Sequence, residues 1–206
     1  MKPQPKERKE IKLYEKRLDM NADKIKELEE QVNKIFRKSQ YNDDKDYIDV
    51  ISIAQNLGFE VGNAMIEEDM DGFILINENQ GDQENQEKLL GIQTDKLIGV
   101  NSKRPIEWKR FIIAHELGHY MLDYVGKNNN GMFAHREHKK GRSERENEID
   151  FFAASLLMPK EKFKKEYIQL KDKELSEDEI IILLSNKFVV TQKMAKRRIG
   201  EIESYA

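Results

Sequence analysis

Apolar residues recur every three or four positions through the charged N-terminal segment. This spacing places them on one side of an α-helix, so it predicts a single long helix over residues 6–38. The stripe also fits a heptad repeat in which Asn21 is the polar member that sets the register. The helix therefore either lies on the body of the protein or pairs with another chain, by self-association or in a coiled coil with a partner. The apolar members are Ile11, Tyr14, Leu18, Ile25, Leu28, Val32 and Ile35.

The rest of the chain alternates between short strands and helices. Strand-like runs occur near 59–61, 72–76, 89–93 and 96–100, with a polar loop over 77–87. Helices are predicted at 48–57, at 105–124, from Ser143 to the residue before Pro159, and at 160–169, 177–187 and 192–203. A basic loop is expected over 127–142. We therefore predict an α+β fold with a small antiparallel or mixed sheet, divided into a helix at 1–40, a core at 41–159 and a helical region at 160–206.

Charge and cysteine content exclude several classes of function. The 206 residues include 36 Lys and Arg against 39 Asp and Glu, a net charge of −3. Because there is no overall basic excess, nucleic acid is not expected as the main partner. The chain has no cysteine, which excludes disulfides, thiolate metal sites and a cysteine nucleophile. No apolar run has the length of a membrane span or the form of a signal peptide, so we expect a cytoplasmic protein without a membrane partner.

The pentapeptide His-Glu-Leu-Gly-His at 115–119 carries the most specific chemistry. Residues four apart on a helix differ by about 40° in direction, so His115 and His119 can bind one Zn²⁺ together. Glu116 is displaced from that face and reaches a metal-bound water rather than the metal. Zinc lowers the pKa of such a water toward roughly 7, and a carboxylate can take its proton. We predict one zinc site with Glu116 as catalytic base and Gly118 leaving space beside the metal.

A third protein ligand is needed, with one position open for water. Glu146 is favoured because it precedes Asp150 by one helical turn, so a metal ligand and a hydrogen-bond partner for a histidine share one face. The competing interpretation is that Glu146 only completes a capping box with Ser143. Glu144, Glu148, His135 and His138 are the other candidates.

Other polar residues leave more than one interpretation open. Asp123 follows His119 by four residues and either binds its imidazole or is a solvated acid at the helix end. The group that stabilises the transition state is not identified among Tyr120, Tyr124, His135, Arg136 and His138. Residues 183–199 read as helix, turn and basic helix, which has the shape of a helix-turn-helix. With little net positive charge, a pair that packs on the core or grips a protein substrate is favoured over DNA binding.

Two blocks of sequence resemble the ImmA/IrrE family of zinc metallopeptidases: RFIIAHELGH at 110–119 and ENEIDFFAASLLMP at 146–159. The resemblance extends over about 41–200 and does not include the N-terminal helix. It implies a zincin-like (gluzincin-like) α+β domain with one Zn²⁺ per chain on His115, His119 and Glu146, and with Glu116 as base. Asp150 stands where asparagine is common in the family.

The resemblance also implies a partner. Members of the family cleave or inactivate helix-turn-helix repressors in bacterial or prophage regulation, so the expected substrate is such a repressor. A non-cleaving anti-repressor that binds and sequesters the repressor is the first alternative, and a DNA-binding regulator is the second.

Overall fold

The computed structural model describes residues 20–42, 45–67, 69–77, 94–127, 132–138 and 143–204, with only the backbone of 132–138. The part of the predicted N-terminal helix before residue 20 lies outside these residues. So do the predicted strand at 89–93 and almost all of the predicted loop at 77–87.

Helix α2 (Ala22–Lys38) begins later than the apolar stripe predicts. Asn21 has an extended backbone (φ −69°, ψ 161°), and its side chain accepts the Lys24 N–H at 2.9 Å. Asn21 is therefore the N-cap of α2, and the prediction of one continuous helix through it is wrong. The physical reason is that the short Asn side chain satisfies a first-turn N–H, which favours a helix start over a helix interior.

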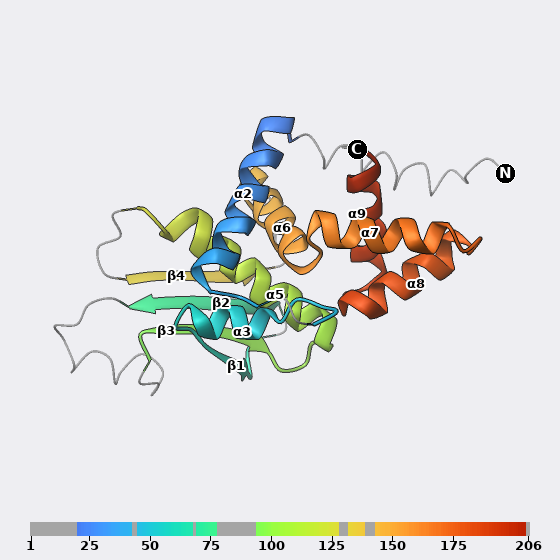
Figure 1. Ribbon diagram of the computed structural model, residues 1–206. Coiled ribbons are helices and arrows are strands. Elements are labelled where there is room, and N and C mark those ends of the chain that lie inside the picture. Colours follow the sequence, from blue (N-terminus) through green and yellow to red (C-terminus); the bar gives the residue numbers. More distant parts are fainter. Residues whose placement is uncertain are drawn as a thin grey trace.

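The apolar stripe of α2 faces the body of the protein. Its buried members are Ile25, Leu28, Val32 and Ile35. They pack mainly on α6, as Figure 1 shows, which confirms the interpretation of a helix lying on the domain. Pairing of this helix with another chain stays a prediction. Pairing through these four buried residues would require α2 to leave the domain.

The sheet is mixed and has the strand order β1-β3-β2-β4. Strand β1 runs parallel to β3, while β2 is antiparallel to both β3 and β4. The strands are β1 (Glu60–Ala64), β2 (Met70–Asn77), β3 (Lys96–Asn101) and β4 (Met132–His138).

Strand β4 corrects the prediction of a basic loop over 127–142. Residues 132–138 pair with β2 along its length, so they satisfy the outer edge of that strand. The sequence Met-Phe-Ala-His-Arg-Glu-His contains no β-branched residue and no clear alternation of apolar and polar positions. Its strand conformation is imposed by pairing with β2 rather than by local preference.

Helix α5 is central to the arrangement in Figure 1: it packs on β2 and β3, with α3 beside it and α6 against its other side. The helices predicted after residue 47 are confirmed, with one exception. The helix expected to end at Tyr124 changes at Tyr120 into a π-turn, where the Val125 N–H donates to the Tyr120 carbonyl at 2.9 Å. The helices are α3 (Val50–Asn56), α5 (Ile106–His119), η1 (Tyr120–Tyr124), α6 (Glu144–Leu157), α7 (Lys160–Lys171), α8 (Glu177–Phe188) and α9 (Gln192–Ser204).

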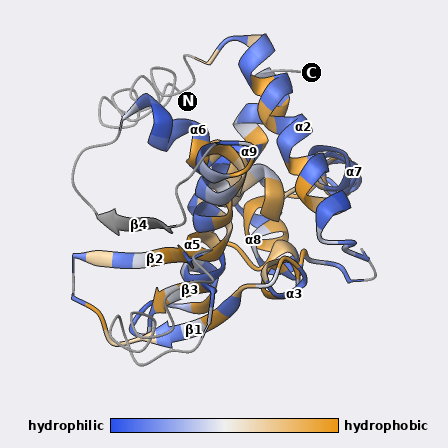
Figure 2. Ribbon diagram, turned by 90° about the vertical axis from the view of Figure 1, so that its left-hand side faces the viewer, coloured by the Kyte–Doolittle hydropathy of each residue, from blue (hydrophilic) through white to orange (hydrophobic). Residues whose placement is uncertain are grey.

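One apolar cluster joins the sheet, α5 and the C-terminal helices. It includes Ile74 and Ile98 from the sheet, Leu117 from α5, and Leu184 and Phe188 from α8, all fully buried. Figure 2 marks hydrophobic stretches on α3 and α8, both of which contribute residues to this cluster. The C-terminal pair thus packs on the core, as favoured above. None of the helices in the described part of the chain combines the length and apolar character of a bilayer span.

Candidate metal centre

Helix α5 places two histidines on one face, as their spacing predicts. The rings of His115 and His119 lie 5.0 Å apart between centroids, and both residues are almost fully buried. Glu146 reaches them from the first turn of α6, with its Oε2 3.3 Å from His115 Nε2 and its Oε1 3.8 Å from His119 Nε2. One ligand atom from each of the three residues falls within 4.8 Å of the others. Glu146 is 24% exposed, so the group opens to solvent on that side.

An aspartate holds the other ring nitrogen of each histidine. His115 Nδ1 lies 3.1 Å from Asp150 Oδ1, and His119 Nδ1 lies 2.8 Å from Asp123 Oδ2. An ionised carboxylate only accepts hydrogen bonds, so each Nδ1 carries the proton and each Nε2 presents a lone pair toward Glu146. The pairing expected for Asp150 is thus present, and of the two alternatives for Asp123 the structure shows the one in which it binds the His119 imidazole.

Arg145 links Asp123 to α6. Its guanidinium donates to Asp123 Oδ1 at 2.6 Å, to the Leu122 carbonyl at 2.6 Å and to Glu148 Oε2 at 2.6 Å. Burial of Asp123 by itself would raise its pKa, but the hydrogen bonds from Arg145 and His119 hold the pKa of this carboxyl below its usual range. Sequence reasoning did not identify Arg145, because nothing in its local pattern indicates a partner 22 residues away.

Of the two interpretations of Glu146, the structure supports the candidate ligand rather than a residue that only completes a capping box. Its backbone N–H donates to Ser143 Oγ at 3.2 Å, so Ser143 caps α6. Its carboxylate faces the histidines instead. The alternative Glu148 pairs with Arg145, Glu144 is exposed, and neither joins the group.

Glu116 lies between α5 and the sheet and is fully buried. A Cβ built on Gly72 of β2 would lie 3.8 Å from Glu116 Oε1 and 2.3 Å from Ile112 Cγ2. Gly72 therefore allows α5 to approach β2 closely enough for this carboxylate to sit beside the strand. Glu116 is next to the histidines in sequence but outside the group of ligand atoms, as expected of a base rather than a ligand.

Gly118 has a different role from the one predicted. A Cβ at this position would lie 2.8 Å from Ile149 Cγ2 and 3.2 Å from Phe152 Cδ1, both on α6. Its small size therefore brings α6 close to α5, rather than leaving space beside a metal. This contact acts on the site indirectly, because α6 carries Glu146.

Of the candidates for stabilising a transition state, the two with described side chains belong to the core. Tyr120 and Tyr124 are buried and stack on each other, and Tyr120 also packs edge-on against Phe59 in the core. The other candidates, His135, Arg136 and His138, belong to β4, whose side chains lie outside the described residues.

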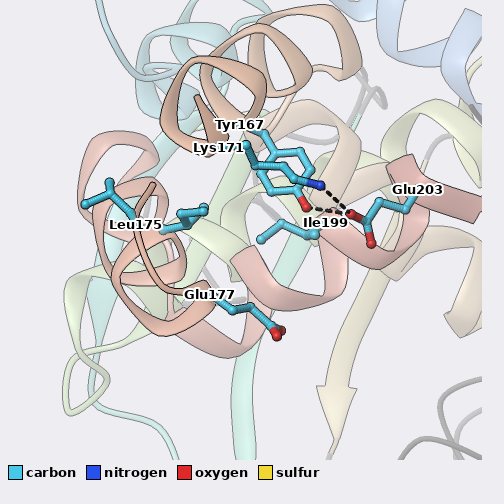
Figure 3. A pocket seen from close by; sticks show the side chains of 7 residues that line it. Tyr167, Lys171, Leu175, Glu177, Ile199 and Glu203 are labelled. Carbon is cyan, nitrogen blue, oxygen red and sulfur yellow. Dashed lines mark hydrogen bonds and ion pairs between the residues drawn. The ribbon is translucent and has the colours of Figure 1, made fainter. Parts of the chain in front are cut away.

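A separate cavity of about 370 Å³ lies among α7, α8 and α9. Figure 3 shows Tyr167 and Lys171 on one side and Glu203 on the other, with the Tyr167 hydroxyl donating to Glu203 at 2.5 Å. Its lining residues include none from α5 or α6, so it is not part of the metal centre.

The donor set fits a divalent transition metal. Two imidazole nitrogens and one carboxylate, each histidine oriented by an aspartate, form a three-ligand set that leaves one coordination position open. Ligand atoms about 2.0–2.1 Å from a tetrahedral ion lie roughly 3.3 Å from one another, close to the spacing of Glu146 and the histidines. The group needs only small side-chain movements to enclose an ion.

Comparison with known proteins agrees with this geometry. No curated protein matches the chain in sequence. Residues 72–200, well over half of the chain, match the family model of the IrrE N-terminal-like domain, peptidase M78. The match begins in β2, includes α5 and α6 with the whole metal centre, and reaches into α9. The chain therefore belongs to the peptidase M78 family of IrrE N-terminal-like domains, a family of metal-dependent peptidases.

Proposed function

We propose that this chain is a zinc-dependent endopeptidase that cleaves a helix-turn-helix repressor in the cytoplasm. The peptidase activity in this proposal is supported by the convergence of His115, His119 and Glu146 from two helices. Each histidine is also hydrogen-bonded to an aspartate. When bound, zinc supplies a Lewis acid that polarises a peptide carbonyl and acidifies water.

The chain's own residues have distinct parts in this chemistry. His115, His119 and Glu146 hold the ion, while Asp150 and Asp123 fix the histidine rings. Glu116 accepts a proton from the attacking water and delivers it to the leaving amine. Its burial between α5 and β2 excludes bulk water and keeps the carboxylate in one orientation.

The repressor as substrate rests on the resemblance of the two sequence blocks and on the family. The acidic net charge of −3 also suits a basic DNA-binding partner better than DNA itself. The substrate to test is a small helix-turn-helix repressor encoded in the neighbouring reading frame.

Glu116→Gln separates a peptidase from a sequestering protein. The variant keeps all three ligands and the size of the side chain, so we expect it to fold, bind zinc and bind the repressor. Loss of a general base typically costs 10²–10⁴-fold in rate, so cleavage on a gel should disappear. If wild type and variant relieve repression equally and neither shortens the repressor, the protein acts by sequestration.

Glu146→Gln tests the ligand set, with Glu148→Gln as its matched control. Both glutamates lie in the first turns of α6, but only Glu146 faces the histidines. We expect Glu146→Gln and His119→Ala to lose zinc in metal analysis of the purified protein, and Glu148→Gln to keep about one ion per chain. Loss of zinc from Glu148→Gln alone would refute this assignment.

A further inference from the structure

Arg110 is a buried cation on the helix that carries the metal ligands. It is 5% exposed and lies five residues before His115 on α5. Its guanidinium donates to the carbonyls of Ile48 at 2.8 Å, Val189 at 3.1 Å and Phe188 at 3.4 Å. Burial lowers the pKa of Arg110, but a guanidinium stays charged in proteins. Among the described residues, the charge is therefore met by backbone carbonyls and by the Tyr47 ring, whose centroid lies 4.9 Å from the guanidinium carbon, rather than by a hydrogen-bonded carboxylate.

Two of these carbonyls belong to the end of α8. The last carbonyls of a helix lack partners within the helix and carry the negative end of its dipole. Phe188 is the last residue of α8, and Val189 follows it in a left-handed conformation with φ 51° and ψ 56°. This conformation is rare for a β-branched residue and persists only where the surroundings enforce it. A strained backbone and a buried cation thus meet at one junction.

The junction of Arg110 with the end of α8 contacts α5 on the side opposite the metal ligands. Five residues along a helix correspond to a rotation of about 140°, so Arg110 points away from the face that bears His115. Pro105 provides no side-chain cap at the start of α5, so tertiary contacts such as Arg110 and the Trp108–Asp71 hydrogen bond of 3.3 Å hold that end. Figure 1 shows α3, the first turns of α5 and the end of α8 together at this point.

We propose that Arg110 is a positioning residue of the metal centre. By binding the Ile48 carbonyl just before α3 and the end of α8 to the back of α5, it sets the rotation of α5 about its axis. That rotation determines where His115 and His119 point relative to Glu146 on α6. This inference rests on the proposed metal function, and it makes the C-terminal helix pair a support of the metal centre.

Arg110→Met tests the proposal, with Ser176→Ala as control. Methionine fills the space but donates no hydrogen bond, whereas Ser176→Ala removes the capping box at the opposite end of the same α8. Zinc affinity is measured by competition with a chelator, and stability by thermal unfolding followed by circular dichroism. We expect both variants to unfold at lower temperature, but only Arg110→Met to bind zinc more weakly, by about 10–100-fold, the range for residues that orient metal ligands.

A purely structural role predicts a different result. If Arg110→Met and Ser176→Ala both keep wild-type zinc affinity in their folded states, the proposal is overturned. Where Arg110→Met does not fold, Arg110→Lys carries the same comparison, because one ammonium cannot reproduce the planar fork of donors. Arg110→Lys is then expected to fold and bind zinc several-fold more weakly, and wild-type affinity would overturn the proposal.

Activity provides a second readout. Repressor cleavage by Arg110→Met should show a lower kcat with KM little changed, because Arg110 is buried on the side of α5 away from His115. A wild-type protein that binds zinc but cuts nothing would refute the proposed peptidase activity, while the zinc measurements would still decide the role of Arg110.

Discussion

Two helical glycines differ in what surrounds them, and the difference predicts opposite effects of the same substitution. A Cβ on Gly118 would lie 2.8 Å from Ile149 Cγ2, closer than a Cβ tolerates, and a tight 3.2 Å from Phe152 Cδ1. A Cβ on Gly200 of α9 would meet no atom of the described residues within 4 Å outside its own helix. We expect Gly118→Ala to destabilise the fold by about 1–3 kcal/mol through overpacking. Gly200→Ala should stabilise it by about 0.5–1 kcal/mol by lowering the entropy of the unfolded chain.

Urea denaturation of the two variants measures both effects. Gly118→Ala should also weaken zinc binding, because it pushes α6 and Glu146 away from α5. Equal stability of the two variants would show that α6 can shift without cost and that Gly118 does not govern the approach of the helices.

Asp150 makes a second residue-scale prediction. It is 4% exposed and holds His115 Nδ1, so Asp150→Ala removes the group that orients this ring. Zinc affinity should fall by about 10–100-fold, measured by chelator competition. The exposed Asp178→Ala on α8 serves as control and should bind zinc like wild type. Unchanged affinity in Asp150→Ala would mean that packing alone orients His115.

At the scale of single elements, the start of α3 is sensitive to pH. Asp49 is the N-cap of α3 and accepts hydrogen bonds from Ser52 N–H and Lys45 Nζ. Burial by itself would raise the pKa of Asp49, but these hydrogen bonds outweigh it and hold the pKa below the ordinary value of 3.8. The ionised carboxylate therefore stabilises the folded state above that value and loses this effect as pH falls through the lowered pKa.

Asp49→Asn tests this sign, because asparagine is also a good N-cap but carries no charge. Wild type should be more stable than the variant near pH 6, and the difference should shrink as the pH falls below about 4. The measurement is the free energy of unfolding in urea at several pH values. A difference that grows toward low pH would contradict the assigned direction.

Several elements follow from local sequence alone, and the structure confirms them. The Ser176 and Glu179 pair forms a complete capping box at the start of α8, as its spacing predicts. Gly58 takes a positive φ of 87° directly after α3. Strand β4 and the π-turn at Tyr120 were not predicted, since each depends on partners or packing that no local pattern records.

At the scale of the whole molecule, the apolar core extends beyond residue 159 into the C-terminal helices. The apolar cluster that contains Leu117 of α5 also contains Leu184 and Phe188 of α8. A chain ending at residue 172 would expose this surface and lose the carbonyls that bind Arg110. We expect it to lack cooperative unfolding and to bind a dye for exposed apolar surface, whereas a chain ending at Ser204 should behave like wild type.

That truncation also tests whether the metal centre depends on α8 and α9, while the division at residues 159 and 160 remains a prediction. If the chain ending at residue 172 unfolds cooperatively and binds zinc, the metal centre folds without α8 and α9, and these two helices are an addition. Loss of both properties would show that the metal centre and the C-terminal helices fold as one unit.

Local sequence patterns were enough to predict the α+β class, most helix boundaries and the placement of the two histidines on one helix face. These features depend on backbone hydrogen bonds and side-chain directions within a few residues, so the spacing of His115 and His119 suffices to place them on one face. Contacts between distant segments are visible only in the tertiary structure: Arg145 on Asp123 and Arg110 on the end of α8. Glu146 was already favoured by its position one turn before Asp150, and the packing of α6 on α5 brings it to the histidines. The physical reason is that such contacts depend on how whole helices and strands pack, and that packing is set by the shape of the entire core rather than by any local spacing.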